Sequence, residues 1–520
     1  MTPPDRPGRP PLDLLRAPIL GPFLRWRHAR TVLQSIFLGL AILIILDGLF
    51  GPQLAPLNLA GVLPWVHWRG FVVLALLVIG NLFCMACPFM LPRRLAKRFL
   101  PASRSWPRVL RSKWAAVALL LLFFWAYEAF NLWASPWLTA WVALSYFILA
   151  FVIDGFFKGA SFCKHLCPIG QFHFVNGMIS PTEVAVRDPE VCERCRTKDC
   201  IRGRYAASPG ASAEGPEPLP IRMDRKEGVA VLEGGAAPGR ALGRRGLVQG
   251  GCELALFQPR KEGNLDCTFC LECIHACPHD NVGILVRSPA AELERDPVRS
   301  GIGRISRRPD FAALALLLVF AAFVNAFGMV EPVFALQSWM ASTLGIPWES
   351  VTLALFFGIG LVVVPFGLVG ATAAASRRLS GGGDSLSRRI STYGWALVPL
   401  GFGMWAAHYL FHLLIGGLTL VPLVQEYLAD LGFSGGPAPR SGTGAVVPES
   451  WIFPVEILLL QGGLFLSLIV GYRIARREES APRTAGLAFL PWAVLATLLT
   501  GLGIWLLVQP MEMRGTFQAI

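Results

Sequence analysis

Long apolar runs dominate this sequence and constrain its fold more than any other feature. A helix of about 20 apolar residues spans the hydrocarbon core of a bilayer, and nine runs approach or exceed that length. The expected spans are 31–50, 68–86, 114–133, 137–156, 310–330, 350–372, 394–421, 451–471 and 486–508. With 54% hydrophobic residues in 520 positions, the chain is too apolar for a soluble domain. We therefore predict a mainly α integral membrane protein with about nine transmembrane helices.

Basic residues alternate between the loops and predict the orientation. The first 30 residues carry six arginines and the loop 93–113 carries eight Lys or Arg, whereas the loop 51–66 carries none. Because Lys and Arg collect in cytoplasmic loops, the N-terminus is expected in the cytoplasm, in the inner membrane of a bacterium, and the C-terminus outside. The same rule accounts for the net charge of +13, so no nucleic-acid partner is expected.

One long segment, 157–308, interrupts the apolar runs. We expect it to form an inserted cytoplasmic α+β domain between a four-helix membrane block at 31–156 and a five-helix block at 309–520, with a cytoplasmic arm at 1–30. Within it, 201–251 is rich in Gly, Pro, Arg and Ala. Such a composition predicts a partly disordered surface insertion.

Eight cysteines of this segment have the spacing of iron–sulfur ligands. The stretch "CTFCLECIHACP" has three cysteines two residues apart and a fourth before proline, as in bacterial ferredoxins, where the fourth binds a second cluster. "CERCRTKDC" supplies the other triplet, and zinc sites use paired cysteines with a long gap instead. The predicted ligands are Cys192, Cys195, Cys200 and Cys277 for one [4Fe–4S] cluster, and Cys252, Cys267, Cys270 and Cys273 for the other.

Four further cysteines lie where two spans are expected to end at the cytoplasmic face. Cys84 and Cys87 belong to "FCMACP", and Cys163 and Cys167 belong to "FCKHLCP". They could bind a third cluster, act as redox-active thiols, or pack as buried cysteines at helix ends. The two matched pairs favour a redox role, and the choice between cluster and thiols stays open.

These motifs resemble a known family. The two Cys–Pro motifs, the "VLPWVHWRG" stretch before them and the two-cluster segment after them are similar to NapH/NosR/CcoG-type membrane iron–sulfur proteins, over about residues 30–290. The resemblance implies membrane-bound electron transfer that serves a quinol, a periplasmic reductase or the maturation of a metal centre. It does not extend to the five C-terminal spans.

The C-terminal spans carry a pair of histidines. "GMWAAHYLFHLLIGG" places His408 and His412 one helical turn apart, inside the membrane. Intramembrane ionisable groups are candidates for quinone, proton or metal sites, with Glu456 as a candidate hydrogen-bond partner, and the structural alternative is a histidine pair bonded between helices. Haem is disfavoured because one turn is too short for two opposite axial ligands.

Two other stretches favour membrane anchoring over chemistry. Met511 and Met513 could bind cuprous copper through their thioethers, but an interfacial anchor is the favoured interpretation. Trp65, His67, Trp68 and Arg69 are expected to anchor the outer end of the second span, with a quinol role for His67 as the minor alternative.

Together these features predict an electron-transfer protein rather than a complete enzyme. It would pass electrons between a cytoplasmic donor, of ferredoxin or flavodoxin type, and a quinone pool or a membrane or periplasmic redox partner. The sequence has no G-x-G-x-x-G fingerprint for a nucleotide cofactor, so the donor is expected to be a separate protein. The alternative is a factor that reduces copper or supports assembly of an oxidase or reductase. A transporter or redox sensor is the least favoured class.

Overall fold

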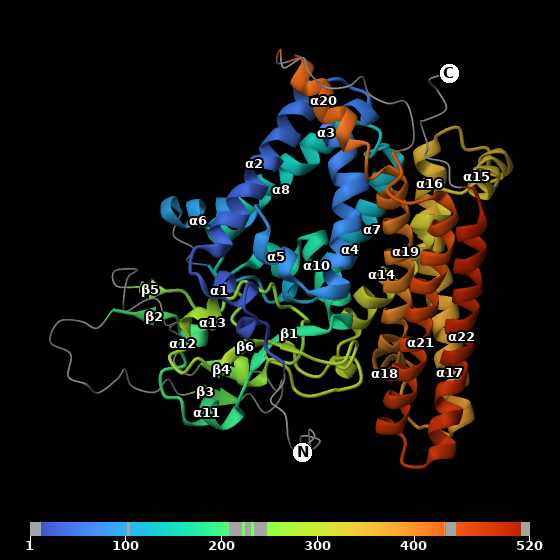
Figure 1. Cartoon of the computed structure of the whole chain (residues 1–520). Helices are drawn as coiled ribbons and strands as arrows, with labels where there is room; N and C mark the ends of the chain where they lie inside the picture. The colour runs from blue at the N-terminus through green and yellow to red at the C-terminus, as the bar shows by residue number, and fades with distance from the viewer. Residues whose placement is uncertain are drawn as a thin grey trace.

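The computed structural model describes residues 12–100, 104–206, 221–223, 230–232, 247–430, 432 and 444–510. In this part of the chain, eight helices are long and apolar enough to cross a membrane, which confirms a mainly α, multi-pass membrane protein (Figure 1). These spans are Ala29–Phe50 (α2), Leu59–Val78 (ending in α4, Arg69–Val78), Pro136–Phe156 (α8), Pro309–Phe327 (α14), Glu349–Ser380 (ending in α17, Val364–Ser380), Leu386–Gly416 (ending in α19, Val398–Gly416), Glu449–Glu478 (mostly α21, Ile452–Glu478) and Pro482–Val508 (α22).

The expected span 114–133 is a shorter helix than predicted. It forms α7 (Trp114–Ala129), an apolar helix of 16 residues. At 1.5 Å per residue it is about 24 Å long, less than the thickness of a typical hydrocarbon core.

The second span begins and ends earlier than the predicted 68–86. The Asn58 side chain caps its start by accepting a hydrogen bond of 2.8 Å from the Ala60 N–H, and the helix ends at Val78 before Gly80, whose φ is +73°. The short helix α5 (Leu82–Ala86) then forms separately. Hydropathy continues through this break, which is why the sequence pattern placed the span too late. The stretch 65–69 consequently lies inside the span, so its predicted position at the outer end is wrong.

The segment 157–308 folds into short helices and two-stranded sheets at one end of α2, α4 and α8 (Figure 1). Strands β1 and β6 pair antiparallel, as do β2 with β5 and β3 with β4. Most of the predicted insertion 201–251 lies outside the described residues. The elements are α9 (Ser161–His165), α10 (Pro168–Asn176), β1 (Thr182–Val186), α11 (Pro189–Arg194), α12 (Asp199–Arg202), β2 (Arg204–Tyr205), β3 (Ile221–Met223), β4 (Ala230–Leu232), β5 (Leu247–Gln249), α13 (Glu272–Ala276) and β6 (Val282–Val286).

The described part of the N-terminal arm lies against this segment. Asp13 bonds Arg187 at 2.8 Å and accepts from the Ile284 N–H at 3.3 Å, while the Val286 N–H donates to the Leu12 carbonyl at 2.8 Å. The basic end of α21 reaches the same region, where Arg473 pairs with Glu294. The arm, the segment 157–308 and the basic end of α21 therefore share one end of the molecule.

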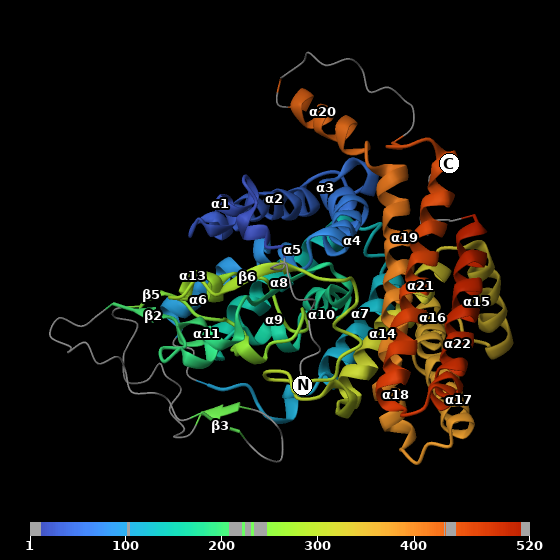
Figure 2. The same cartoon turned by 60° about the horizontal axis from the view of Figure 1, so that its bottom comes forward.

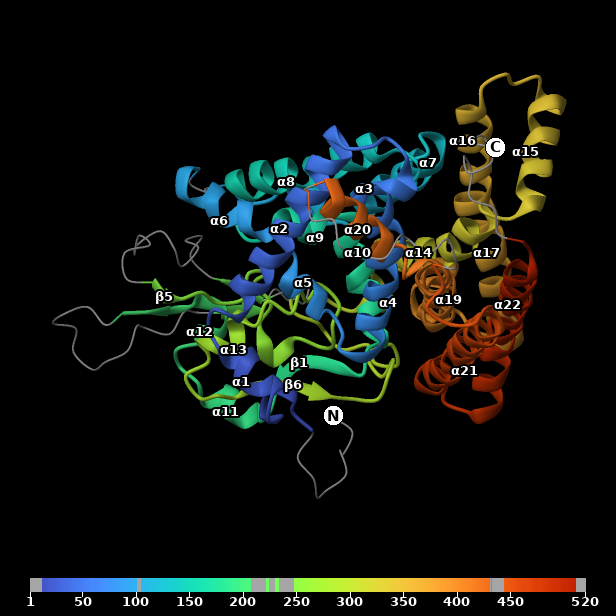
Figure 3. The same cartoon turned by 45° about the horizontal axis from the view of Figure 1, so that its top comes forward.

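Helices α14 and α19 join the two membrane blocks. Seen from two further directions, they lie between α4, α7 and α10 on one side and α17, α21 and α22 on the other (Figures 2 and 3). The apolar window of α14 is 83% buried, against 11% for that of α2. A helix that is apolar on all sides suits such a central position. The Trp405 indole of α19 donates to the Leu318 carbonyl of α14 at 2.8 Å and fixes the contact.

Candidate metal centres

Four cysteines line one small cavity next to β6, and we call them group 1: Cys192, Cys195, Cys200 and Cys277. They come from α11, α12 and the turn after α13. Burial raises the pKa of the Cys200 thiol to about 12, and the charges of the other three cysteines add to the increase. The structure thus brings together the four residues predicted to share the first cluster.

A second set, group 2, consists of Cys252, Cys267, Cys270 and Cys273. Burial raises the pKa of the Cys273 thiol well above its usual value, and the charges of the other three cysteines raise it further. The residues on either side of Cys270, Phe269 and Leu271, have positive φ of 50° and 59°. Left-handed residues in such turns direct backbone N–H groups into a concavity that suits anions, including iron–sulfur clusters.

The two groups have the same local architecture despite different cysteine spacing. Lys198 and Leu271 are both left-handed and precede α12 and α13, and Cys200 and Cys273 are the second residues of those helices. The two helices also pack against each other. The gap of four residues before Cys200, which departs from the ferredoxin run, therefore leads to the same backbone geometry as the gap of two.

The remaining cysteines form group 3: Cys84, Cys87, Cys163 and Cys167. Burial raises the pKa of the Cys84 thiol well above its usual value, with further increases from Cys87, Cys163 and Cys167. The Cys167 sulfur caps α10 by accepting from the Gly170 N–H at 3.3 Å. The two Cys–Pro motifs, far apart in the sequence, therefore meet at one place.

The three groups follow one another in space. Group 1 meets group 2 where the Cys252 N–H donates to the Cys200 carbonyl at 2.8 Å, and the charge of Cys252 acts on the Cys200 thiol. Group 2 meets group 3 where the Asn81 amide donates to the Cys267 carbonyl at 2.8 Å, and the charge of Cys267 acts on Cys84. Group 2 is the middle member of the series.

The donor atoms fit iron–sulfur clusters better than a single ion. Among the described residues, no three His, Cys, Asp or Glu side chains converge on one metal ion. A [4Fe–4S] cluster has a different requirement, because its thiolate ligands bind separate irons and stand apart. Backbone N–H groups donate to the sulfurs of Cys252 and Cys277 at 3.4 and 3.3 Å, as does the Asn281 amide to Cys192 at 3.3 Å. Such bonds tune the potential of bound clusters.

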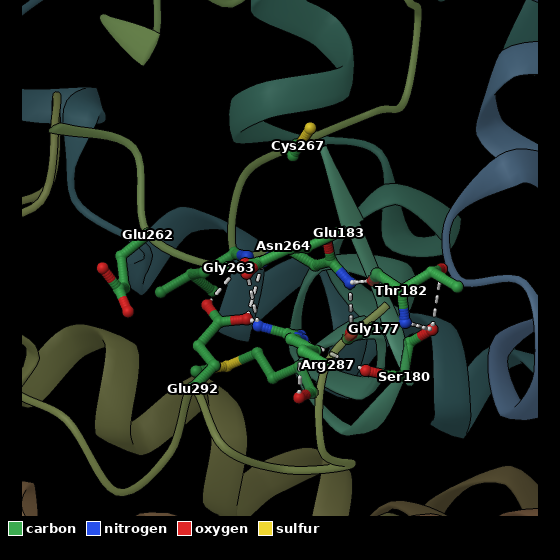
Figure 4. A network of polar contacts seen from close by, with 12 residues as sticks. Gly177, Ser180, Thr182, Glu183, Glu262, Gly263, Asn264, Cys267, Arg287 and Glu292 are labelled. Carbon is green, nitrogen blue, oxygen red and sulfur yellow. Dashed lines mark hydrogen bonds and ion pairs between the residues drawn. The ribbon is translucent and has the colours of Figure 1, made fainter. Parts of the chain in front are cut away.

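A buried polar network positions the loop that leads into group 2 (Figure 4). The Glu292 carboxylate accepts from the N–H groups of Asn264 and Leu265 at 2.6 and 3.1 Å and pairs with Arg287 and Arg299. The Asn264 amide donates to the Thr182 carbonyl, at the start of β1, at 2.7 Å. Cys267 is therefore held by a scaffold in which each buried charge is paired.

Two buried arginines lie between groups 2 and 3, and the sequence did not reveal them. Arg30 bonds Glu253 at 3.0 Å and Glu272 at 2.8 Å, and Arg93 also pairs with Glu253. The side chains of Arg30 and Arg93 are 4% and 3% exposed. The charge of Arg30 acts on the thiols of Cys87 and Cys270. Both residues flank apolar runs, so the sequence pattern indicates only an orientation signal at these positions.

The histidine pair lies on α19. The ring centroids of His408 and His412 are 4.9 Å apart, and His408 is fully buried with neither ring nitrogen hydrogen-bonded in the described part of the chain. Glu456 of α21 is buried too, but no hydrogen bond joins it to either histidine among the described residues. Met511 and Met513 lie outside the described residues.

Comparison with known proteins supports a ferredoxin-type segment. Over 48 residues, 9% of this chain, the sequence is 35% identical to the methylamine utilization ferredoxin-type protein MauN of Paracoccus denitrificans (strain Pd 1222). The match spans 17% of the length of that protein. No family model and no solved structure matches the chain. The similarity supports an iron–sulfur, ferredoxin-type segment, and the closer resemblance to NapH/NosR/CcoG-type proteins remains a sequence-based interpretation.

Proposed function

We propose that this chain is a membrane-bound iron–sulfur electron-transfer protein that connects a cytoplasmic donor with a quinone pool or with a membrane or periplasmic redox partner. The observation that carries the proposal is the arrangement of all twelve cysteines in three neighbouring groups of four, in series toward the membrane. [4Fe–4S] clusters bound there would supply one-electron transfer between successive groups.

The protein residues would hold these centres and set their potentials. Six of the twelve cysteines are buried away from water, and the N–H groups directed at Cys192, Cys252 and Cys277 stabilise negative charge on the ligands. Arg30 and Arg93 place positive charge between groups 2 and 3, and Glu253 and Glu272 balance it, so each arginine favours the reduced state relative to a neutral side chain in its place. Because reduction adds an electron, nearby positive charge favours the reduced state there.

Group 1 is the proposed entry point for a soluble partner. Glu193 and Arg194 of α11 and the following Arg196 are exposed beside Cys195, which is itself partly exposed. Two exposed arginines next to a redox centre favour encounter with an acidic protein, as ferredoxins and flavodoxins commonly are. This supports a donor that docks on α11 and α12.

Metal analysis of anaerobically purified protein tests the proposal. We expect four irons and four acid-labile sulfides per occupied group, no stoichiometric copper, and electron paramagnetic resonance signals after reduction. Folded, monodisperse protein with negligible iron and sulfide would contradict electron transfer. Stoichiometric copper would favour the assembly-factor alternative.

Single substitutions assign the groups. Cys277→Ser should remove the signal of group 1, and Cys84→Ser that of group 3, while the other signals persist. An unchanged iron content in Cys84→Ser would show that group 3 holds no cluster and would favour redox-active thiols there.

A further inference from the structure

A charged residue lies inside the membrane where the two helix blocks meet. The Arg69 guanidinium of α4 lies over three aromatic rings, those of Trp65, Tyr127 and Tyr409, at 4.5, 4.8 and 5.1 Å from their centroids. Its Nη1 donates to the Tyr127 hydroxyl at 3.3 Å. The rings come from the same span, from α7 and from α19. Because a charged group is costly in a bilayer, such a residue is a functional candidate by default.

The histidine pair belongs to the same cluster. The His408 ring centroid lies 5.8 Å from that of Tyr409, over which Arg69 lies, and 4.9 Å from that of His412. Both ring nitrogens of His408, and Nε2 of His412, are buried without a hydrogen-bond partner in the described residues. Buried polar atoms are nearly always hydrogen-bonded, so unpartnered ones call for a ligand or another explanation.

Packed rings connect this cluster to group 3. Ring centroids are 6.4 Å apart from Tyr409 to Phe172, 6.2 Å from Phe172 to His173, and 5.0 Å from His173 to Phe83. Phe83 directly precedes Cys84. The His173 and Phe83 rings are stacked with 9° between their planes, and neither nitrogen of the fully buried His173 is hydrogen-bonded in the described part of the chain.

We propose that Arg69, Tyr127, Tyr409, His408 and His412 form the site at which a membrane quinone exchanges electrons with group 3. This inference rests on the proposed function, and it names the acceptor and its place. A quinone offers a flat ring that packs on the aromatic side chains and two carbonyl oxygens that accept hydrogen bonds from Arg69 and from a histidine N–H. A haem is disfavoured, because the two histidines are one turn apart on a single helix.

The proposed exchange balances protons and electrons. Oxidation of the quinol breaks two O–H bonds: the protons are relayed one at a time to water through the neutral rings of His412 and His408, each ring accepting a proton at one nitrogen and releasing one from the other, and the two electrons leave one at a time for the iron–sulfur centre of group 3. Phe172, His173 and Phe83 fill the space between the two sites. Reduction of the quinone reverses each transfer.

Binding of a short-chain quinone tests the site without relying on turnover. The full chain in lipid nanodiscs is titrated with decylubiquinone, and quenching of tryptophan fluorescence is recorded. We expect saturable quenching, at least about tenfold weaker binding in Arg69→Gln, and a smaller loss in His412→Gln, whose side chain is only partly buried and whose replacement threatens the fold less. The matched control is Glu456→Gln, a buried residue on the neighbouring helix α21 that makes no bond to the histidines.

Several outcomes would overturn the site. The site is refuted if quenching in the wild type does not saturate, or if Arg69→Gln and His412→Gln bind the quinone with wild-type affinity. It is also refuted if Glu456→Gln loses as much affinity as Arg69→Gln. Iron content and resonance signals of the same preparations separate this failure from failure of the proposed function. Normal clusters with no quinone binding reject only the site, whereas quinone binding without iron rejects the electron-transfer function. A second readout is the rate at which quinone re-oxidises the reduced centres, which should fall in His408→Gln while the signals stay intact.

Discussion

Among the described residues, buried charges are paired in the scaffold around group 2, whereas several buried polar groups are unpaired in the polar cluster within the membrane. Around group 2, Glu292 is paired with Arg287 and Arg299, and Lys113 with Asp266. In the membrane, His408 and His412 keep buried ring nitrogens without partners in the described residues. Paired buried charges hold a structure in one conformation, whereas unpartnered ones gain nothing from the fold alone. The difference indicates that the first region holds one rigid conformation, whereas the second can bind a ligand or a proton.

Removal of the Glu292 carboxylate should have the largest effect on stability. In Glu292→Gln the buried Arg299 loses its counter-charge while Arg287 keeps its pair with Glu183, and breaking a buried pair costs about 3–5 kcal/mol. The measurement is the thermal unfolding midpoint in detergent. The control Glu262→Gln breaks the more exposed pair with Arg295, which should cost at most about 1 kcal/mol. Equal shifts in the two variants would refute the scaffold role.

Acid should weaken the same scaffold. Burial would raise the pKa of Glu292, but the charges of Arg299 and Arg287 and two backbone hydrogen bonds outweigh it, so the pKa lies below the usual 4.5. A carboxylate with a lowered pKa stabilises the fold above its unfolded pKa and loses that contribution as the pH falls. We expect the unfolding midpoint to drop as the pH falls from 5 to 3, below the unfolded pKa of the carboxyl, and to drop less in Glu292→Gln. Parallel curves would contradict this assignment.

Arg30→Gln should lower the midpoint potentials of groups 2 and 3. Loss of one buried positive charge disfavours the reduced state, by an amount on the order of 60 mV for one electron. Redox titration followed by electron paramagnetic resonance measures the change. Arg25→Gln is the control, because Arg25 is partly exposed and pairs with Asp280 at 3.5 Å. A potential that does not move in Arg30→Gln would show that this arginine is only structural.

The smallest change in the unfolding midpoint is expected when a Glu inside the membrane, Glu456, is replaced by Gln. Glu456→Gln replaces a buried carboxyl whose Oε1 has no hydrogen-bond partner in the described residues, so no ion pair is broken. The shift of the unfolding midpoint should correspond to a change of less than about 1 kcal/mol in the free energy of unfolding. A loss as large as that of Glu292→Gln would break the contrast between the two regions.

The sequence by itself determined what depends on neighbours along the chain. Hydropathy identified the eight helices of the described residues that are long and apolar enough to span a membrane, because a helix crosses a bilayer only if about 20 successive residues are apolar. The spacing of the cysteines predicted which of them would meet in groups 1 and 2, because local turns fix their relative positions. It also placed the pairs of group 3 at one face, although their direct meeting depends on how α5 packs against α2 and α4 and how α9 packs against α8 and α10.

Only the tertiary structure decided the rest. The hydropathy pattern shows no break at Gly80, so the second span is predicted too far toward the C-terminus. Arg69 is consequently predicted at the membrane surface instead of inside the span. Arg30 resembles an ordinary orientation signal until Glu253 and Glu272, more than 200 positions away, are packed against it. The aromatic contacts of Phe83 with His173 and of Phe172 with Tyr409 likewise join segments remote in sequence. Such features depend on which helices pack together, and no local pattern encodes that choice.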